Sequence, residues 1–269
     1  MRIGFNFTSA EGLPIAKRLL ADNLIDYCEI LIDNFLHLDP KDIRNHFDCP
    51  IAFHIMRSCF LESSDKYLSD IAERIKYHAR ELNPIYVSDH LAEFSINGRL
   101  LHFISEIDYR KRMVIFNKIA RWQEMLECQL FLENYPSLLD GGHEAPHFFS
   151  EMRHKTGAGL LFDISNAVCA AHNCEYSSDL WIEEARSTSH YHIAGYGPAI
   201  SDDNLFLDTH AEEISSLTMQ FFLENRDIFT RDNATVTYER DRNLDYESIA
   251  RDIVKIKSAC DLNAEGSPQ

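Results

Sequence analysis

The feature that most constrains this chain is a regular alternation of strand-like and helix-like runs. Short segments rich in β-branched and aromatic residues, bounded by breakers, recur along its 269 residues and are typical of buried strands. The strand candidates are 3–7, 27–33, 51–56, 86–92, 130–135, 160–165, 191–195 and 235–240. The clearest helix candidates are 11–22, 64–83, 109–127, 212–226 and 245–259. A strand followed by a helix, repeated eight times, predicts an α/β fold: a closed parallel (β/α)8 barrel of the triosephosphate-isomerase type.

The same pattern predicts a single domain. Hydrophobic residues make up 45% of the chain, which is enough for a full core, and one barrel commonly has this length. No linker or internal repeat marks a second unit. We expect the barrel to occupy residues 1–262 and the tail, 263–269, to be disordered.

Charge and composition exclude several classes of function. The net charge is -17, from 43 acidic and 26 basic residues, which argues against nucleic acid and against a polybasic membrane surface. No apolar run approaches the roughly 20 residues of a membrane span, and the N-terminus lacks a secretory signal. The seven cysteines form no disulfide framework, so we expect reduced thiols and a cytoplasmic location. The charge is compatible with bound cations or with a basic protein partner.

Polar side chains occur near the C-terminal end of every predicted strand. Strands buried on both faces should be almost entirely apolar, so these residues need an explanation. They are Asn6, Glu29, His54, His90, Glu133, Asp163, His192 and Glu239. The sequence DTH after the seventh strand adds Asp208 and His210. Active sites of such barrels are built at this end, so the pattern predicts a polar site in the barrel mouth.

Alternation along the strands predicts which side chains face inward. In HYHIAGY, His190 and His192 share one face, and Glu133 shares a face with Phe131 in the fifth predicted strand. The interior can therefore be apolar at the bottom and ionisable at the top. We expect His192 to face the site, with His190 beneath it or at its edge.

The convergence of carboxylates with histidines predicts a metal site. Glu133, Asp163 and Glu239 would repel one another and raise their own pKa values unless a cation sat among them. Arg240 is the only obvious strand-borne basic residue. Imidazole and carboxylate donors without thiolate suit iron, manganese or zinc. The donors exceed what one ion accepts, so two or three ions are expected, and each of the three carboxylates could bridge a pair. These residues alone do not choose the metal.

Other motifs carry less weight. Cys169, His172 and Cys174 in CAAHNC lack a fourth ligand at a usual zinc spacing. We interpret Cys59 as an ordinary loop cysteine, although a reactive thiol near the mouth is the alternative. The roles of these three cysteines stay open. GYGP, 195–198, predicts a turn, and no phosphate-binding glycine motif occurs.

Seven spaced segments resemble a known family. They are FHIMRS, VSDHLAE, LENYPS, FDISNA, YHIAGY, DTHAE and TYERD. In their residues and their order they resemble the motifs of the multinuclear non-haem iron-dependent oxidases. Within that family they most resemble the methanobactin-biosynthesis branch. The match runs from the third predicted strand to the eighth, so it covers most of the chain.

The resemblance implies a specific chemistry. Members hold two or three non-haem irons, mixed Fe(II) and Fe(III), in the mouth of the barrel and use O2 as co-substrate. They modify a cysteine in a ribosomally made precursor peptide that carries a leader. The methanobactin branch works as a heterodimer with an MbnC-like partner protein. It converts cysteine to an oxazolone plus a thioamide during synthesis of this copper chelator.

The resemblance also implies roles for individual residues. Metal ligands would be His54, His90, Glu133, Asp163, His192, Asp208, His210 and Glu239, with Asn166 as a further candidate. Among these, the expected catalytic residues are Glu133, Asp163, His192 and Glu239. Asn6, Arg240 and Asp241 lie near the predicted mouth and are candidates for substrate contact.

Three alternatives remain open at this point. A divalent-metal sugar isomerase would use manganese or magnesium and show no oxygen dependence. A multi-zinc phosphodiesterase on the same barrel fits poorly with the net charge of -17. A non-catalytic scaffold would hold its metals for structure alone, and oxygen consumption with a cysteine peptide would exclude it.

Overall fold

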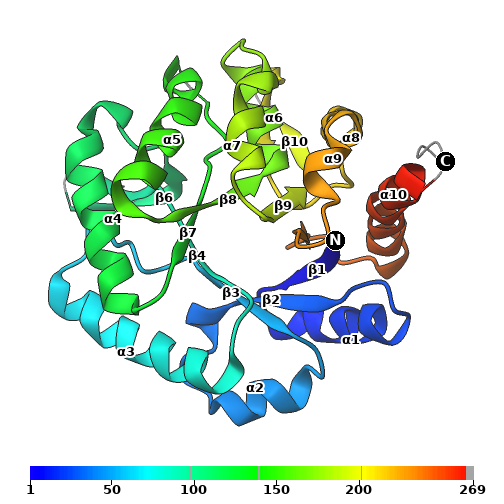
Figure 1. Cartoon of the computed structure of the whole chain (residues 1–269), viewed down its shortest axis with the longest axis horizontal. Coiled ribbons are helices and arrows are strands. Elements are labelled where there is room, and N and C mark those ends of the chain that lie inside the picture. The colour runs from blue at the N-terminus through cyan, green and yellow to red at the C-terminus, as the bar shows by residue number, and fades with distance from the viewer. Residues whose placement is uncertain (97, 139, 201, 265–269) are drawn as a thin grey trace.

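Eight parallel strands close into a barrel, as the sequence predicts. The computed structural model describes residues 1–96, 98–138, 140–200 and 202–264 (Figure 1). The barrel strands are β1 (Arg2–Phe7), β2 (Tyr27–Leu31), β3 (Ile51–Ile55), β4 (Val87–His90), β7 (Leu130–Glu133), β8 (Gly159–Asp163), β9 (His190–Ala194) and β12 (Thr235–Glu239). Their order around the barrel is β1-β12-β9-β8-β7-β4-β3-β2. The predicted (β/α)8 class is confirmed, and each barrel strand coincides with one predicted run.

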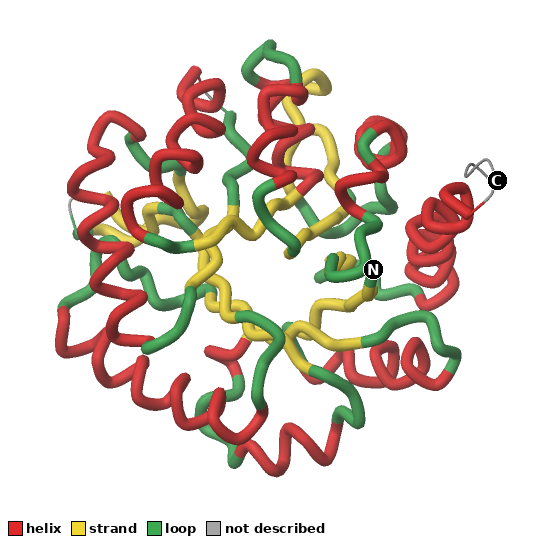
Figure 2. Tube along the Cα trace, viewed as in Figure 1, coloured by secondary structure: helices red, strands yellow, loops and turns green. Residues whose placement is uncertain are grey.

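Helices surround the strands on the outside (Figure 2). They are α1 (Leu13–Ala21), α2 (Pro40–His46), α3 (Asp65–Leu82), α4 (Arg112–Leu126), α5 (Ala145–Thr156), α6 (Ile164–Asn173), α7 (Ile182–Arg186), α8 (Ser216–Glu224), α9 (Arg226–Phe229) and α10 (Tyr246–Ala264). Single 3-10 turns cover Ala10–Gly12, Ile32–Asn34, Tyr109–Lys111, Asp140–Glu144 and Ser178–Trp181. The five predicted helices correspond to α1, α3, α4, α8 and α10.

Helix α3 has the side-chain spacing and the capping residues that make a helix predictable from its sequence. Its buried residues include Leu68, Ala72 and Ile75, which lie on one face at a spacing of three to four. The Ser64 side chain accepts a hydrogen bond from the Tyr67 backbone N–H and caps the first turn. Asn83, at φ 50°, ends the helix in the left-handed conformation that commonly closes helices.

Two antiparallel hairpins extend the loops that follow β4 and β9. The first joins β5 (Glu93–Ile96) to β6 (Arg99–Ser105), and the second joins β10 (Tyr196–Ala199) to β11 (Asp202–Asp208). The predicted turn at 195–198 is therefore wrong, because most of it lies in β10, where Tyr196 pairs with Asp208. The pairing with β11 brings Asp208 back to the barrel mouth.

The barrel interior is partly polar, and its floor is aromatic. The His190 ring lies between Tyr86 and Phe131, with ring centroids 4.5 and 4.6 Å away, and its Nδ1 is 2.8 Å from Thr235 Oγ1. His192 is two residues further along the same strand, toward the mouth. Of the two positions expected for His190, beneath the site or at its edge, the structure shows the first.

Gly159 makes room for this aromatic floor. A Cβ atom at Gly159 would lie 2.3 Å from the Phe131 ring, so Gly159→Ala must displace the ring that packs on His190. We expect a loss of about 1–3 kcal/mol in the free energy of unfolding, measured by urea denaturation. Gly12→Ala is the control, because its Cβ would meet the Phe7 ring at an ordinary 3.5 Å. Equal stability of both variants would contradict the argument.

The C-terminal end of the described chain is helical. Helix α10 runs to Ala264, and the rest of the tail expected to be disordered, 265–269, lies outside the described residues. None of the helices within the described ranges is long and apolar enough to cross a membrane.

Candidate metal centre

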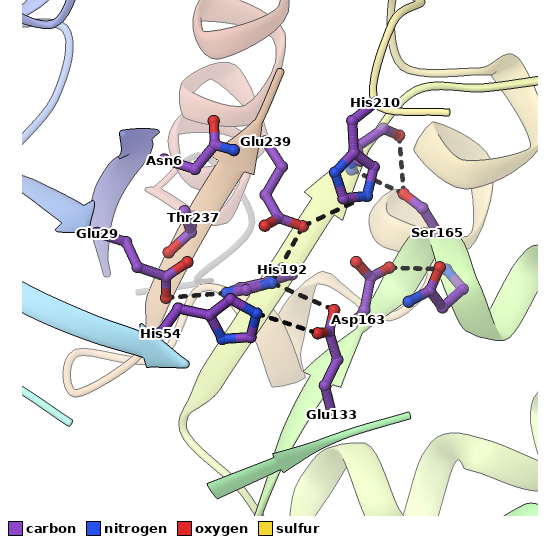
Figure 3. A network of polar contacts seen from close by, with 12 residues as sticks. Asn6, Glu29, His54, Glu133, Asp163, Ser165, His192, His210, Thr237 and Glu239 are labelled. Atoms are coloured by element: carbon purple, nitrogen blue, oxygen red, sulfur yellow. Dashed lines mark hydrogen bonds and ion pairs between the residues drawn. The ribbon is translucent and has the colours of Figure 1, made fainter. Parts of the chain in front are cut away.

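The predicted ligands converge at the C-terminal mouth of the barrel (Figure 3). His54, His90, Glu133, Asp163, His192 and Glu239 come from β3, β4, β7, β8, β9 and β12 in turn. Metal-capable atoms within 4.8 Å of one another form three overlapping groups. These are Glu29–His54–His192, His54–His90–Glu133 and Glu133–Asp163–His192–Glu239.

The His54–His90–Glu133 group is a compact set of two imidazoles and one carboxylate. Glu133 Oε2 lies 3.5 Å from His54 Nε2 and 3.3 Å from His90 Nε2. The two Nε2 atoms are 3.4 Å apart. Two histidines and one carboxylate on one side of an ion are the ligand set typical of non-haem iron(II) enzymes.

Glu133 also faces a second group. Its Oε1 atom is 3.4 Å from His192 Nδ1, which is in turn 3.1 Å from Glu239 Oε2. Asp163 completes this group. Because the two oxygens of Glu133 point to different histidines, this carboxylate is placed to bridge two ions.

Asp208 and His210 extend the cluster outward. His210 Nε2 lies 2.8 Å from Asp208 Oδ1 and 3.7 Å from Glu239 Oε2. His210 has φ 45°, an uncommon conformation for a residue other than glycine, which turns the end of the hairpin back over the mouth. The structure therefore brings the loop pair to the strand-borne ligands.

In each of the four histidines one ring nitrogen has a protein partner, which leaves the other nitrogen for a metal. These contacts are His54 Nδ1 to Ser88 Oγ at 2.8 Å, His90 Nδ1 to Ile55 O at 3.1 Å, His192 Nε2 to Glu29 Oε2 at 3.0 Å and His210 Nδ1 to Asp241 Oδ2 at 3.1 Å. Metal-binding histidines almost always carry such a second contact, which fixes the ring and its tautomer.

Unpartnered buried atoms gather at the same place. Within the described part of the chain, seven buried side-chain nitrogen and oxygen atoms lack a hydrogen-bond partner. They are Asp163 Oδ2, Asn166 Oδ1, His192 Nδ1, Asp208 Oδ1, Thr209 Oγ1, His210 Nε2 and Glu239 Oε2. Four of them face each other as ion pairs, His192 Nδ1 with Glu239 Oε2 at 3.1 Å and His210 Nε2 with Asp208 Oδ1 at 2.8 Å. A buried polar atom without any partner costs about 1–3 kcal/mol, as for Asp163 Oδ2 and Asn166 Oδ1. Six belong to predicted ligands, so bound cations would satisfy them together, and the residues fit a multinuclear metal site.

The electrostatics of the site agree with this reading. Burial, followed by repulsion from Glu133, Asp208 and Glu239, raises the pKa of Asp163 well above its usual range. Burial lowers the pKa of His192, but Glu239 and Glu29 outweigh it and hold that pKa well above normal. Without metal, the cluster therefore retains protons at positions that cations would occupy.

The lower part of the cluster behaves differently. Burial and then the neighbouring His90 depress the pKa of His54 to about 3. His54 is therefore neutral at physiological pH, which is the form that binds metals. Burial opposes ionisation of Glu133, but His90 and His192 outweigh it and keep its pKa below normal.

Asn166 lies at the start of α6, beside the other ligands. Its backbone N–H donates to Asp163 Oδ1 at 2.7 Å, and its Nδ2 donates to the Asn134 carbonyl at 3.0 Å. Oδ1 is left unpartnered. A cavity of about 30 Å³ is lined by Asn166, His90, Glu133, Asp208 and His210, among other residues. The position is compatible with the ninth predicted ligand.

The three predicted substrate contacts differ in orientation. Asn6 donates to Asp241 Oδ1 at 2.8 Å, and Asp241 Oδ2 faces His210 Nδ1, so this pair supports a ligand. Arg240 is 5% exposed, and its guanidinium binds the Tyr238 and Ser248 hydroxyls. The Arg240 side chain lies on the helix-facing side of β12, and a role in substrate contact gains no support from this geometry.

The described cysteines are not part of the metal-capable groups. None of the three metal-capable groups found in the described residues includes a cysteine. His172 Nε2 is 2.8 Å from the Asn204 carbonyl, and its ring stacks on Phe206. Cys169 is buried, and Cys174 Sγ lies 3.8 Å from the Ser137 carbonyl. Burial, followed by the charge of Glu62, raises the pKa of the Cys59 thiol to about 11, which disfavours the reactive thiolate form.

Sequence reasoning missed the residues that support the ligands. Glu29 was recognised as a strand-end residue, but its contact with His192 spans 163 positions of sequence and has no local signal. Ser88, which contacts His54, was not singled out. Alternation offered a clue, since Ser88 shares a strand face with His90.

Comparisons with solved structures show a common fold. An L-ribulose 3-epimerase aligns at TM-score 0.60 and 15% identity, covering 100% of this chain and 98% of its own. A xylose isomerase-like TIM barrel protein from Mycobacterium smegmatis, solved with magnesium, aligns at TM-score 0.63 and 14% identity, covering 96% and 97%. At these identities the likeness extends to the barrel and not to activity.

Curated relatives are more similar in sequence. A UPF0276 protein of Anaeromyxobacter sp. (strain Fw109-5) is 26% identical over 243 residues, covering 83% of this chain and 82% of the relative. A UPF0276 protein of Caulobacter vibrioides is 29% identical over 208 residues, 71% of each chain. A third, from Psychromonas ingrahamii, is 26% identical over 183 residues, and the match spans 63% of that relative's length.

One family accounts for nearly the whole chain. The family described as RiPP precursor modification enzyme MbnB/TglH/ChrH matches residues 4–261, which include all the converging ligands and every barrel strand except the first two residues of β1. The chain therefore belongs to the MbnB/TglH/ChrH family of enzymes that modify ribosomally made precursor peptides.

Proposed function

We propose that this chain is a multinuclear iron-dependent oxidase that uses O2 to modify a cysteine of a ribosomally made precursor peptide. The observation that carries the proposal is the convergence of buried imidazole and carboxylate groups at the barrel mouth, in a chain of a peptide-modifying family. Six atoms of this cluster have no hydrogen-bond partner, and a buried polar atom in that state is costly unless a ligand satisfies it.

The donor set favours iron. His54, His90 and Glu133 would hold one ion, and Glu133, Asp163, His192 and Glu239 a second. Asp208 and His210 lie where a third would bind, next to Glu239. When bound, iron supplies the one-electron chemistry that O2 requires and stabilises a cysteine as its thiolate.

The protein's own residues orient the ligands and limit access to them. Glu29 Oε2 and Asp241 Oδ2 accept the distal N–H groups of His192 and His210, so both rings present their other nitrogen to the cluster. The cavity beside the cluster measures only about 30 Å³. A cysteine side chain that entered this cavity would lie beside His90, Glu133 and His210.

The finer assignment follows the methanobactin branch. We propose that the product is an oxazolone plus a thioamide and that an MbnC-like partner forms a heterodimer with this chain and helps to bind the peptide leader. In this conversion the peptide loses four electrons and four protons, and one O2 accepts them to give two water molecules. The net charge of -17 favours a basic surface on the partner or on the peptide.

The metal content tests the proposal directly. We expect protein produced in iron-enriched medium to hold two or three coupled irons per chain, measured by elemental analysis and Mössbauer spectroscopy. With the partner present, it should consume O2 together with a cysteine peptide, and the peptide should lose the mass of four hydrogen atoms. Removal of the iron by a chelator should abolish the reaction, and restoring ferrous iron should recover it.

The alternatives give different results in the same experiment. Stoichiometric manganese or zinc with no oxygen dependence would favour a sugar isomerase or a phosphodiesterase. Bound iron without turnover of any cysteine peptide, with the partner present, would favour a scaffold. Either result would contradict the oxidase assignment.

A further inference from the structure

Glu29 is a deeply buried carboxylate that the proposed ligand set leaves unused. It lies on β2, inside the barrel and beside His192, and is 1% exposed (Figure 3). A charged carboxylate at such a position is costly unless it is paired and hydrogen-bonded. Its retention in the barrel interior therefore calls for a specific partner.

Its partners are the histidine at the centre of the cluster and a tyrosine from the floor. Glu29 Oε2 lies 3.0 Å from His192 Nε2, and the Tyr86 hydroxyl donates to the same oxygen. The Tyr86 oxygen is also 3.0 Å from Thr237 Oγ1, which is 2.8 Å from the Tyr27 hydroxyl. The carboxylate is thus held in place by its surroundings and aimed at the far side of the His192 ring.

We infer that Glu29 is the positioning residue that selects the metal-binding form of His192 and sets its donor strength. The inference rests on the proposed metal centre. Because the carboxylate accepts the Nε2–H of His192, the ring takes the tautomer whose Nδ1 carries no proton. Nδ1 faces Glu133 and Glu239. A carboxylate in this position also pulls on the Nε2 proton, which makes Nδ1 a stronger donor.

Hydrogen bonding distinguishes this role from that of a further metal ligand. Glu29, His54 and His192 form one of the metal-capable groups by distance alone. However, Glu29 Oε2 already accepts two hydrogen bonds, and the unpartnered nitrogen of His192 is Nδ1, on the opposite side of the ring. Neither Glu29 nor His192 Nε2 is among the unpartnered atoms of the described residues.

The contact differs from those of the other three histidines. His54 meets the Ser88 hydroxyl, and His90 meets a backbone carbonyl, both of which are neutral. His210 meets the Asp241 carboxylate, whose side chain is 38% exposed and therefore screened by water. Glu29 alone among the four partners is a carboxylate shielded from solvent, so its charge acts on the ring at low dielectric. We expect Glu29 to lower the reduction potential of the ion bound by His192, and to do so more than the partners of the other histidines lower the potentials of their ions.

Glu29→Gln is the primary test. The amide oxygen can accept both hydrogen bonds, so the variant removes the charge while keeping the shape. We expect ferrous iron and zinc, titrated anaerobically without peptide, to bind the His192 position about 10–100-fold more weakly. The reduction potential of the iron at that position should rise. Mössbauer spectroscopy during a mediated redox titration measures this potential. Asp252→Asn is the matched control, because Asp252 is a fully buried carboxylate on α10 that is bonded to Tyr238 and the Ile214 backbone.

Tyr86→Phe provides a second variant that predicts the opposite sign. Loss of the Tyr86 hydroxyl removes one donor from Glu29 Oε2 and leaves the carboxylate a stronger acceptor for His192. The reduction potential should fall, whereas a merely structural role would give no shift or the same shift in both variants. This variant also keeps the test decisive if Glu29→Gln fails to fold.

The outcomes separate the inference from the proposed function. Unchanged affinity and potential in Glu29→Gln, or shifts of one sign in both variants, would overturn the positioning role. Complete loss of one ion, with the others bound normally, would show that Glu29 is a ligand and would also overturn it. Wild-type protein that binds neither iron nor zinc would instead overturn the metal centre itself, before any variant is compared.

Discussion

Replacing Glu133 with alanine is expected to empty the metal centre and to abolish oxidation of the peptide. Glu133 is placed between two groups, with Oε2 within 3.5 Å of His54 and His90 and Oε1 3.4 Å from His192. Loss of a bridging carboxylate removes a ligand from two ions at once. Changes that only disturb the surroundings of ligands already cost about 10–100-fold in affinity, so we expect iron binding to weaken by more than about 100-fold.

Two further variants identify the cause. Glu133→Gln keeps the size of the side chain but removes its charge, and it should lose most of the iron as well. Glu184→Gln is the control: Glu184 is also a buried glutamate, but it pairs with Arg153 on the outside of the barrel. Iron content is measured by elemental analysis and turnover by O2 consumption. Full iron occupancy and normal turnover in Glu133→Ala would remove Glu133 from the ligand set and refute the proposed bridge.

The barrel was predictable because its signals are local. Each strand is a short apolar run, and the alternation of its side chains decides which residues face inward. That rule placed Glu133 above Phe131 and His192 above His190, and the structure has both pairs in those positions. The helix-facing orientation of Arg240 follows from the same rule, because its neighbour Glu239 points inward. The sequence interpretation of Arg240 considered only its proximity to the mouth and not the alternation.

The two hairpins differ in how far the sequence predicts them. The dipeptide Asn-Gly at 97–98 is flanked by apolar residues that include Phe94, Ile96, Leu100 and Leu101, which is a strong local hairpin signal that the sequence interpretation did not use. The β10 strand contains Gly197 and Pro198, both of which normally disfavour a strand. It pairs with β11, which packs against α6, and such tertiary contacts override local preference.

The second large effect is expected at Asp163, where one side chain performs two tasks. Oδ1 accepts the Asn166 backbone N–H at 2.7 Å and caps α6, whereas Oδ2 is an unpartnered atom facing the cluster. Asparagine caps helices about as well as aspartate but is neutral. We therefore expect Asp163→Asn to keep the fold of the helix and to lose the metal, whereas Asp163→Ala should also lose about 1 kcal/mol of capping energy.

Without metal, Asp163→Asn should stabilise the folded protein instead of weakening it. Burial and the charges of Glu133, Asp208 and Glu239 raise the pKa of Asp163, and this outweighs the opposing effect of His192. Between the normal aspartate pKa and this raised value the folded state binds more protons than the unfolded state, so this group makes stability fall as pH rises. Asparagine does not titrate. In a chelator, Asp163→Asn should be more stable than wild type at neutral pH, and the difference should shrink toward pH 4.

Added metal should reverse that order. An ion at 100 times its Kd stabilises the folded wild type by about 2.7 kcal/mol, and Asp163→Asn should gain much less. Thermal unfolding at neutral pH, with chelator and then with ferrous iron or zinc, measures both effects in one pair of proteins. If wild type is the more stable of the two without metal, the carboxylates at the mouth do not repel one another enough to destabilise the fold. The repulsion inferred from these carboxylates would then be wrong, because only such repulsion makes removal of a ligand stabilising until the metal arrives.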